Sequence, residues 1–181
     1  MAKANPERKA IDKVFILLGT GAVIVLLGAS LLAFVGYRFA TSQVRTELSA
    51  QKIYFPEKGA ANFSAEEYPG LQQYAGQIVD NGPKAKAFAN EYIAHHLEKI
   101  AGGKTYSEVS ELAMKDPTDA KLQQQKAILF QGETLRGMLL GNGYGYWTFG
   151  MMALYASVAA LIAAVVMSGL VLLGLRHVKR S

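Results

Sequence analysis

Two stretches of the chain contain no charged residue, and they decide its fold class. Residues 14–37 read VFILLGTGAVIVLLGASLLAFVGY, and residues 147–175 read WTFGMMALYASVAALIAAVVMSGLVLLGL. Each is longer than the roughly 20 apolar residues that a helix needs to cross a bilayer. We therefore predict an all-α membrane protein with two transmembrane helices, which flank a small helical extracytoplasmic domain at 38–146.

The charges outside these stretches predict the orientation. The 181-residue chain has a formal net charge of +5 at pH 7. The excess lies in two short basic tails, 1–13 and 176–181, whereas the segment between the spans is neutral overall. Basic tails stay in the cytoplasm, while long neutral loops are translocated. The pattern predicts a protein of the cell (plasma) membrane with both termini cytoplasmic and the central domain outside.

A signal peptide is the alternative interpretation of the first apolar stretch. Its run from Val14 to Tyr37 exceeds the roughly 7–15 apolar residues of a typical signal core. No small-x-small cleavage site follows before Arg38. These features favour an uncleaved anchor.

Several kinds of chemistry are excluded by composition. The sequence has no cysteine, which excludes disulfides, thiolate nucleophiles, cysteine zinc sites and iron–sulfur clusters. The spans lack the ionisable groups that pumps and proton relays place there. Basic and acidic residues balance in the segment between the spans, so we expect no nucleic-acid partner.

Periodicity and end signals predict helices in the outer domain. Apolar residues recur at helical spacing over about 83–100, and Gly102 ends this helix. Thr105 and Glu108 have the spacing of a capping box for the next helix. A longer helix, at about 118–140, then runs toward the second span.

Small side chains recur every four residues along the second span. Ala156, Ala160, Ala164 and Ser168 form a smooth stripe, which allows close approach of another helix. We expect this stripe to pack against the first span. Self-association or a partner membrane helix are the alternatives.

Glycine and aromatic residues alternate where the chain enters the second span. Aromatic rings with a polar edge prefer the membrane–water interface. We therefore predict an aromatic belt there, and the alternative is a hinge or a collar that docks a partner. The expected interface residues are Tyr37, Tyr144, Tyr146, Trp147 and Phe149.

Two adjacent histidines are the nearest approach to a metal site. His95 and His96 lie on the predicted helix, and Glu91 precedes His95 by one turn. A stable site needs a third or fourth ligand, which the pattern does not supply. We predict no catalytic residue, metal or cofactor, and name Glu91, His95 and His96 as the metal-ligand candidates to examine.

Four short stretches of the chain are Tyr74-Ala75-Gly76-Gln77-Ile78, Ile93-Ala94-His95-His96-Leu97-Glu98, Gly102-Gly103-Lys104-Thr105-Tyr106-Ser107-Glu108 and residues 129–136. They resemble a family of small actinobacterial two-span membrane proteins of unknown function. The resemblance covers about residues 70–175, and it implies an anchor, a short helical outer domain and a second span. Some members are labelled aromatic ring-opening dioxygenase. We do not adopt that label, because its iron site commonly needs two histidines and a carboxylate on one face.

These observations favour a non-enzymatic two-span membrane protein. We expect it to be an accessory or scaffold subunit of a cell-envelope assembly, with the lipid bilayer and another membrane protein or a second copy as partners. One alternative is a lipid- or ligand-binding outer domain, in which Phe88, Tyr92 and His96 line a pocket instead of a core. The other is a metal-dependent enzyme that uses His95 and His96.

Overall fold

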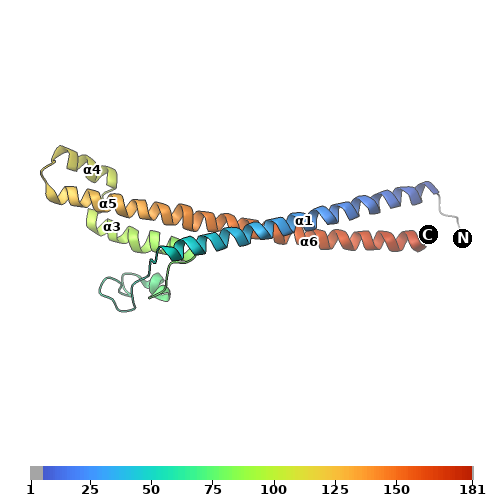
Figure 1. Cartoon of the computed structure of the whole chain (residues 1–181), viewed down its shortest axis with the longest axis horizontal. Helices are drawn as coiled ribbons and strands as arrows, with labels where there is room; N and C mark the ends of the chain where they lie inside the picture. Colours follow the sequence, from blue (N-terminus) through green and yellow to red (C-terminus); the bar gives the residue numbers. More distant parts are fainter. Residues whose placement is uncertain (1–5, 181) are drawn as a thin grey trace. The chain divides into compact units, whose positions relative to one another are not determined.

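The computed structural model describes residues 6–180 of the chain, with side chains over 10–179. The two expected basic tails therefore lie partly outside the described residues, at 1–5 and at 181. Helix accounts for about 81% of the chain, and no strand occurs in the part described (Figure 1). The elements are α1 (Pro6–Ala50), η1 (Pro69–Tyr74), α2 (Gly82–Ala87), η2 (Phe88–Ile93), α3 (Ala94–Ala101), α4 (Tyr106–Lys115), α5 (Ala120–Met138), η3 (Leu139–Gly145) and α6 (Tyr146–Arg180).

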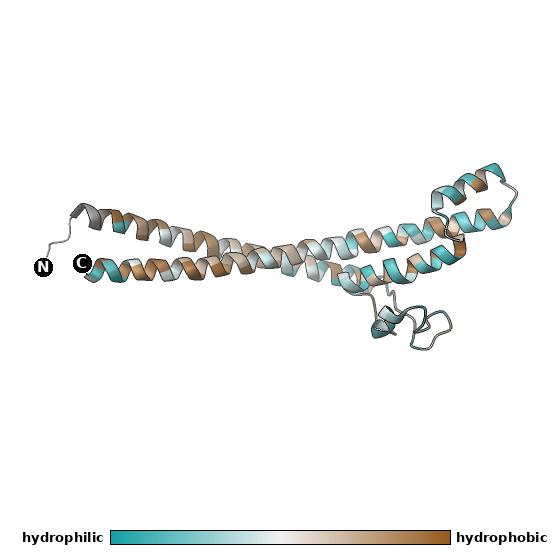
Figure 2. Ribbon diagram, turned by 180° about the vertical axis from the view of Figure 1, so that it is seen from behind, coloured by the Kyte–Doolittle hydropathy of each residue, from teal (hydrophilic) through white to brown (hydrophobic). Residues whose placement is uncertain are grey.

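The helical fold class is confirmed, together with two helices long and apolar enough to cross a membrane. Figure 2 shows apolar residues concentrated in the N-terminal part of α1 and in α6, and mixed polarity elsewhere. The chain divides into two compact units, which we describe separately. The first contains Met1–Phe39 and Gly150–Ser181, and the second contains Ala40–Phe149.

The two helices of the first unit pack along a seam with a seven-residue repeat. Buried and half-buried positions recur at alternating spacings of three and four residues in each helix. This is the spacing of left-handed helix pairs, in which about 3.5 residues complete each turn. The seam consists of Asp12, Ile16, Gly19, Val23, Leu26, Ser30, Ala33 and Tyr37 from α1, and of Gly150, Ala153, Ser157, Ala160, Ala164, Met167, Val171, Gly174 and Val178 from α6.

Two glycines allow the helices to approach closely in the seam. A methyl group added to Gly19 would lie 2.7 Å from Val171 Cγ2, and one added to Gly174 would lie 3.3 Å from Ile16 Cγ1. Gly19 thus lies opposite Val171, and Ile16, three residues before Gly19, lies opposite Gly174, three residues after Val171. The two helices are therefore antiparallel. Larger side chains at Gly19 would force the two helices apart.

A buried pair of serines joins the seam farther along. The Ser30 hydroxyl donates to the Ser157 carbonyl oxygen at 2.9 Å, and the Ser157 hydroxyl donates to the Ser30 carbonyl oxygen at 2.8 Å. Both side chains are buried. Every polar atom of this pair thus has a partner, as an apolar environment requires.

The predicted stripe of small residues coincides with the seam only in part. Ala164 is buried and Ala160 is half-buried, whereas Ala156 is exposed. Ser168 is half-buried, and its hydroxyl donates to the Ala164 carbonyl oxygen of its own helix. Residues four apart are displaced by about 40° around a helix. A row of residues with this spacing therefore turns away from a straight seam after a few repeats.

In the second unit, the helices begin and end at recognisable residues. The Asn81 side chain accepts from Lys84 N–H at the start of α2, and Gly102 ends α3 with a φ of 60°. The predicted capping box is confirmed, because Thr105 and Glu108 bond each other's backbone. Hydrogen bonds from the Thr105 backbone and hydroxyl lower the pKa of Glu108 below its ordinary value.

The chain of helices from α5 to α6 is continuous. The π-helix η3 joins α5 to α6, and a single helical stretch runs from Ala120 to Lys179. A second π-helix, η2, joins α2 to α3 in the same way. Two glycines serve close packing in this unit: a methyl group at Gly132 would lie 2.5 Å from Leu97 Cδ2, and one at Gly143 would lie 2.9 Å from Ala85 Cβ.

The antiparallel seam predicts a specific cross-link in this cysteine-free chain. Ile16→Cys combined with Gly174→Cys should form a disulfide on mild oxidation in membranes, because these positions are in contact. The matched control replaces Ile16→Cys by Leu17→Cys, since Leu17 is 72% exposed. The measurement is the mass of the chain after blocking free thiols. Equal cross-linking of both pairs would contradict the seam.

Candidate functional sites

The first candidate site is the aromatic face of η2 and α3, which belongs to the core. Phe88 is 7% exposed, and its ring meets Phe55 edge-on at 5.1 Å. The Tyr92 ring lies 5.9 Å from Phe63 and 5.5 Å from Tyr68. This face is thus covered by aromatic side chains from the irregular segment before α2.

His96 is held by tyrosines within that face. Its Nδ1 lies 3.2 Å from the Tyr92 carbonyl oxygen and 3.1 Å from the Tyr68 hydroxyl. A carbonyl oxygen can only accept a hydrogen bond, so the tautomer with its proton on Nδ1 fits this position. The ring is also half-buried. His96 therefore serves the packing of the core.

His95 makes a different set of contacts. Its Nε2 lies 2.7 Å from Glu67 Oε1, and Lys99 pairs with the same carboxylate oxygen. Glu67 thereby connects the irregular segment to α3. Its backbone N–H donates to the Ser64 hydroxyl at 3.2 Å.

The metal-ligand candidates do not converge in the described residues. No group of three or more His, Asp or Glu side chains there is placed to hold a metal ion. Glu91 is exposed, and its carboxylate faces Gly70, whereas His95 pairs with Glu67. His177 is exposed near the C-terminal end of α6.

The expected interface aromatics fall into two groups. A methyl group on Gly82 would lie 2.5 Å from Trp147 Cβ, so Trp147 packs on the backbone at the start of α2. The Tyr144 and Trp147 rings are stacked, with their centres 6.1 Å apart. Lys86 Nζ lies over the Tyr144 ring, 4.8 Å from the centre of that ring. Tyr146 and Phe149, by contrast, are 39% and 66% exposed. In the first unit, Tyr37 is half-buried, and its ring lies 6.0 Å from that of Phe34.

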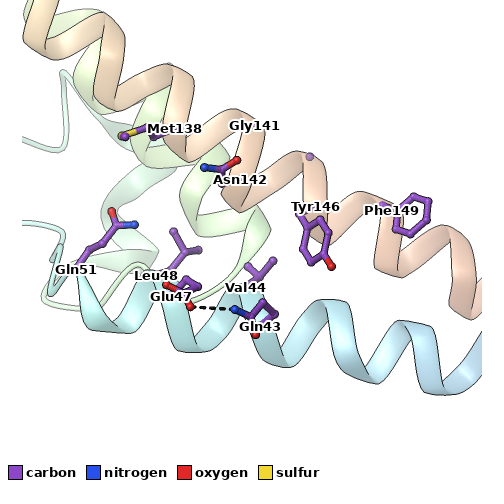
Figure 3. A pocket seen from close by; sticks show the side chains of 11 residues that line it. Gln43, Val44, Glu47, Leu48, Gln51, Met138, Gly141, Asn142, Tyr146 and Phe149 are labelled. Carbon is purple, nitrogen blue, oxygen red and sulfur yellow. Dashed lines mark hydrogen bonds between the residues drawn. The ribbon is translucent and has the colours of Figure 1, made fainter.

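The second candidate site is an open groove of about 680 Å³ in the second unit. Figure 3 shows its two walls, one from the C-terminal part of α1 and one from α5, η3 and the start of α6. No local pattern in the sequence marks this groove, because its walls at 43–51 and 138–149 are far apart in the chain. The lining residues are Gln43, Val44, Glu47, Leu48, Gln51, Met138, Gly141, Asn142, Gly145, Tyr146 and Phe149.

The groove combines an apolar surface with three side-chain amides and one carboxylate. Val44 and Leu48 are each 3% exposed and form part of the core beneath it. The Gln43 amide donates to Glu47 Oε1 at 2.9 Å (Figure 3). The arrangement suits binding, because ligand pockets of roughly 300–1,000 Å³ commonly pair apolar walls with a few polar groups.

No known protein family, curated protein or solved structure matches this chain. The resemblance to small actinobacterial two-span membrane proteins therefore stays a prediction.

The aromatic core predicts a loss of stability at high pH. Burial raises the pKa of Tyr92 above its ordinary value, and burial followed by the neighbouring Tyr92 raises that of Tyr68. Their folded-state pKa values exceed the unfolded value near 10, so the stability they contribute is complete below pH 10 and is lost as pH rises through the folded values. Tyr92→Phe should flatten this part of the pH dependence of the free energy of unfolding. Tyr54→Phe is the control, because Tyr54 is 55% exposed, and an equal effect of both variants would refute the assignment.

Proposed function

We propose that the protein is a non-enzymatic two-span protein of the cell membrane, with both termini cytoplasmic and the second unit outside. It serves as an accessory or scaffold subunit of a cell-envelope assembly. The proposal is carried by one observation: the seam covers a single face of each apolar helix and leaves the remaining apolar surface open. Large side chains such as Phe15, Leu17 and Leu32 are 69%, 72% and 73% exposed. Lipid or a partner helix would cover this surface in a membrane.

The exposed surface of α1 includes a place for close helix contact. A methyl group on Gly28 would have no atom within 4 Å in the described structure, and Gly28 lies about 200° around the helix from the seam residue Leu26. Small residues let membrane helices approach one another, which an isolated lipid-facing helix does not need. This supports a further membrane helix as the partner.

The carboxylates of the second unit support a structural role for its polar residues. Glu67 pairs with His95 and Lys99, and Glu108 belongs to a capping box. The Asp119 side chain accepts from two backbone N–H groups at the start of α5. Each of these groups is thus engaged in holding the fold.

Thiol labelling tests the orientation. Single cysteines at Lys104 and Lys121 should react with a membrane-impermeant maleimide on intact cells, because both positions are exposed in the second unit. Cysteines at Lys13 and Lys179 should react only after permeabilisation. Labelling of the tail positions on intact cells would overturn the proposed orientation.

Purification from native membranes tests the accessory role. A chain tagged at its C-terminus and extracted in mild detergent should yield a particle that contains a second membrane protein at a fixed ratio. Gly28→Leu should weaken that association about tenfold, equivalent to about 1.4 kcal/mol, while Gly28→Ala should retain it. A particle that contains this chain alone, or equal retention by both variants, would contradict the proposal.

A further inference from the structure

We propose that the groove of the second unit binds one membrane lipid with an uncharged, hydroxyl-rich head group, such as a glycosyl diacylglycerol. The inference goes beyond the accessory role and rests on the membrane insertion proposed above. It follows from the position, shape and charge of the groove.

The position of the groove fits a lipid head group. Phe149, at one end, lies within the predicted span 147–175, and Met138 lies 11 residues earlier at the other end. At 1.5 Å per residue this separation is about 16 Å, whereas the head-group layer of one leaflet is only about 5–8 Å thick. Along the helix, the groove is therefore longer than a small phosphate ester reaches. A head group built of sugar rings has the required length.

The wall of the groove is held open by a glycine. A methyl group added to Gly141 would have no atom within 4 Å in the described residues, so this part of the wall is bare backbone beside free space. Gly141 belongs to the π-helix η3, a rare form that is frequent at functional sites. Phe149 and Met138 remain 66% and 55% exposed at the rim. Phe149, at the end that lies within the predicted span, offers apolar contact to the part of the acyl chains next to the head group.

The charge of the groove selects the kind of head group. Of the described residues that line it, Glu47 is the only charged one, and the side chains of Gln43, Gln51 and Asn142 are amides. An anionic phosphate would find no lysine or arginine there and would face the Glu47 carboxylate. Hydroxyl groups both donate and accept, so they match amides and a carboxylate. The side-chain amides of Gln51 and Asn142 make no hydrogen bond to other described residues, which leaves them available to a ligand.

Lipid retention by the full-length chain tests the inference. The wild-type protein, in detergent micelles, is incubated with digalactosyl diacylglycerol or with phosphatidylglycerol of the same acyl chains, and bound lipid is counted by native mass spectrometry. We expect one galactolipid per chain and at least about tenfold weaker retention of phosphatidylglycerol, a difference of about 1.4 kcal/mol.

Two glycine substitutions distinguish the groove from other lipid contacts. Gly141→Phe should fill the groove and abolish galactolipid retention, and the Cβ of the new side chain would have no atom within 4 Å in the described residues. Gly137→Phe is the matched control, because Gly137 lies on the adjoining helix α5, is equally open and does not line the groove. Asn142→Ala combined with Gln51→Ala should weaken galactolipid binding while leaving the folded mass and thermal transition unchanged.

Several outcomes would overturn the inference. These are no galactolipid on the wild-type chain, a preference for phosphatidylglycerol, or equal retention by the two phenylalanine variants. If soluble methyl galactoside displaced the galactolipid when present at the same concentration, the sugar alone would account for binding. That result would reject a lipid as the ligand. A dimer that Gly141→Phe dissociates would assign the groove to a second copy of the chain. Labelling of the tail positions on intact cells would instead reject the proposed orientation, so the two failures are distinguishable.

Discussion

The close contact of α1 with α6 along small side chains is the constraint on which the first unit depends. Within a bilayer, apolar surface alone gives helices no preference for one another over lipid. Gly19 and Gly174 bring the backbones near enough for contact at Val171 and Ile16. In the membrane that we propose surrounds these helices, the Ser30–Ser157 bonds add little energy, since interhelical bonds in membranes average about 0.6 kcal/mol. Because both hydroxyls require a partner, however, they fix which residues of the two helices lie opposite each other.

The second unit lacks cysteine, and it also relies on glycines that allow close packing. Their packing partners here are larger side chains than in the first unit. Gly82 lies under Trp147, and Gly132 receives Leu97. In each pair, a side chain packs where the opposing residue has no Cβ. Close packing of this kind orders the unit without covalent cross-links. The irregular segment before α2 completes the core through Phe63, which is fully buried.

The sequence was sufficient for features that depend on local chemistry. Charge-free stretches marked the two apolar helices, and Thr105 with Glu108 marked the start of α4. The seam register, the two π-helices and the groove were not predicted, because each depends on which surfaces meet after folding. The π-helix η2 has no distinct local signal in the sequence. The same limit applies to His95, whose partner Glu67 is 28 residues away.

The glycines of η3 show how one short helix serves two purposes. Gly143 is buried against Ala85 and Leu48, where an added methyl group would lie 2.9 Å and 3.4 Å from their side chains. Gly141, two residues earlier, has open space in its place. Residues two apart lie on opposite sides of a helix, so η3 joins the core with one side and borders the groove with the other. A side chain at Gly143 would thus change the fold, whereas one at Gly141 would change only the space that a ligand can occupy.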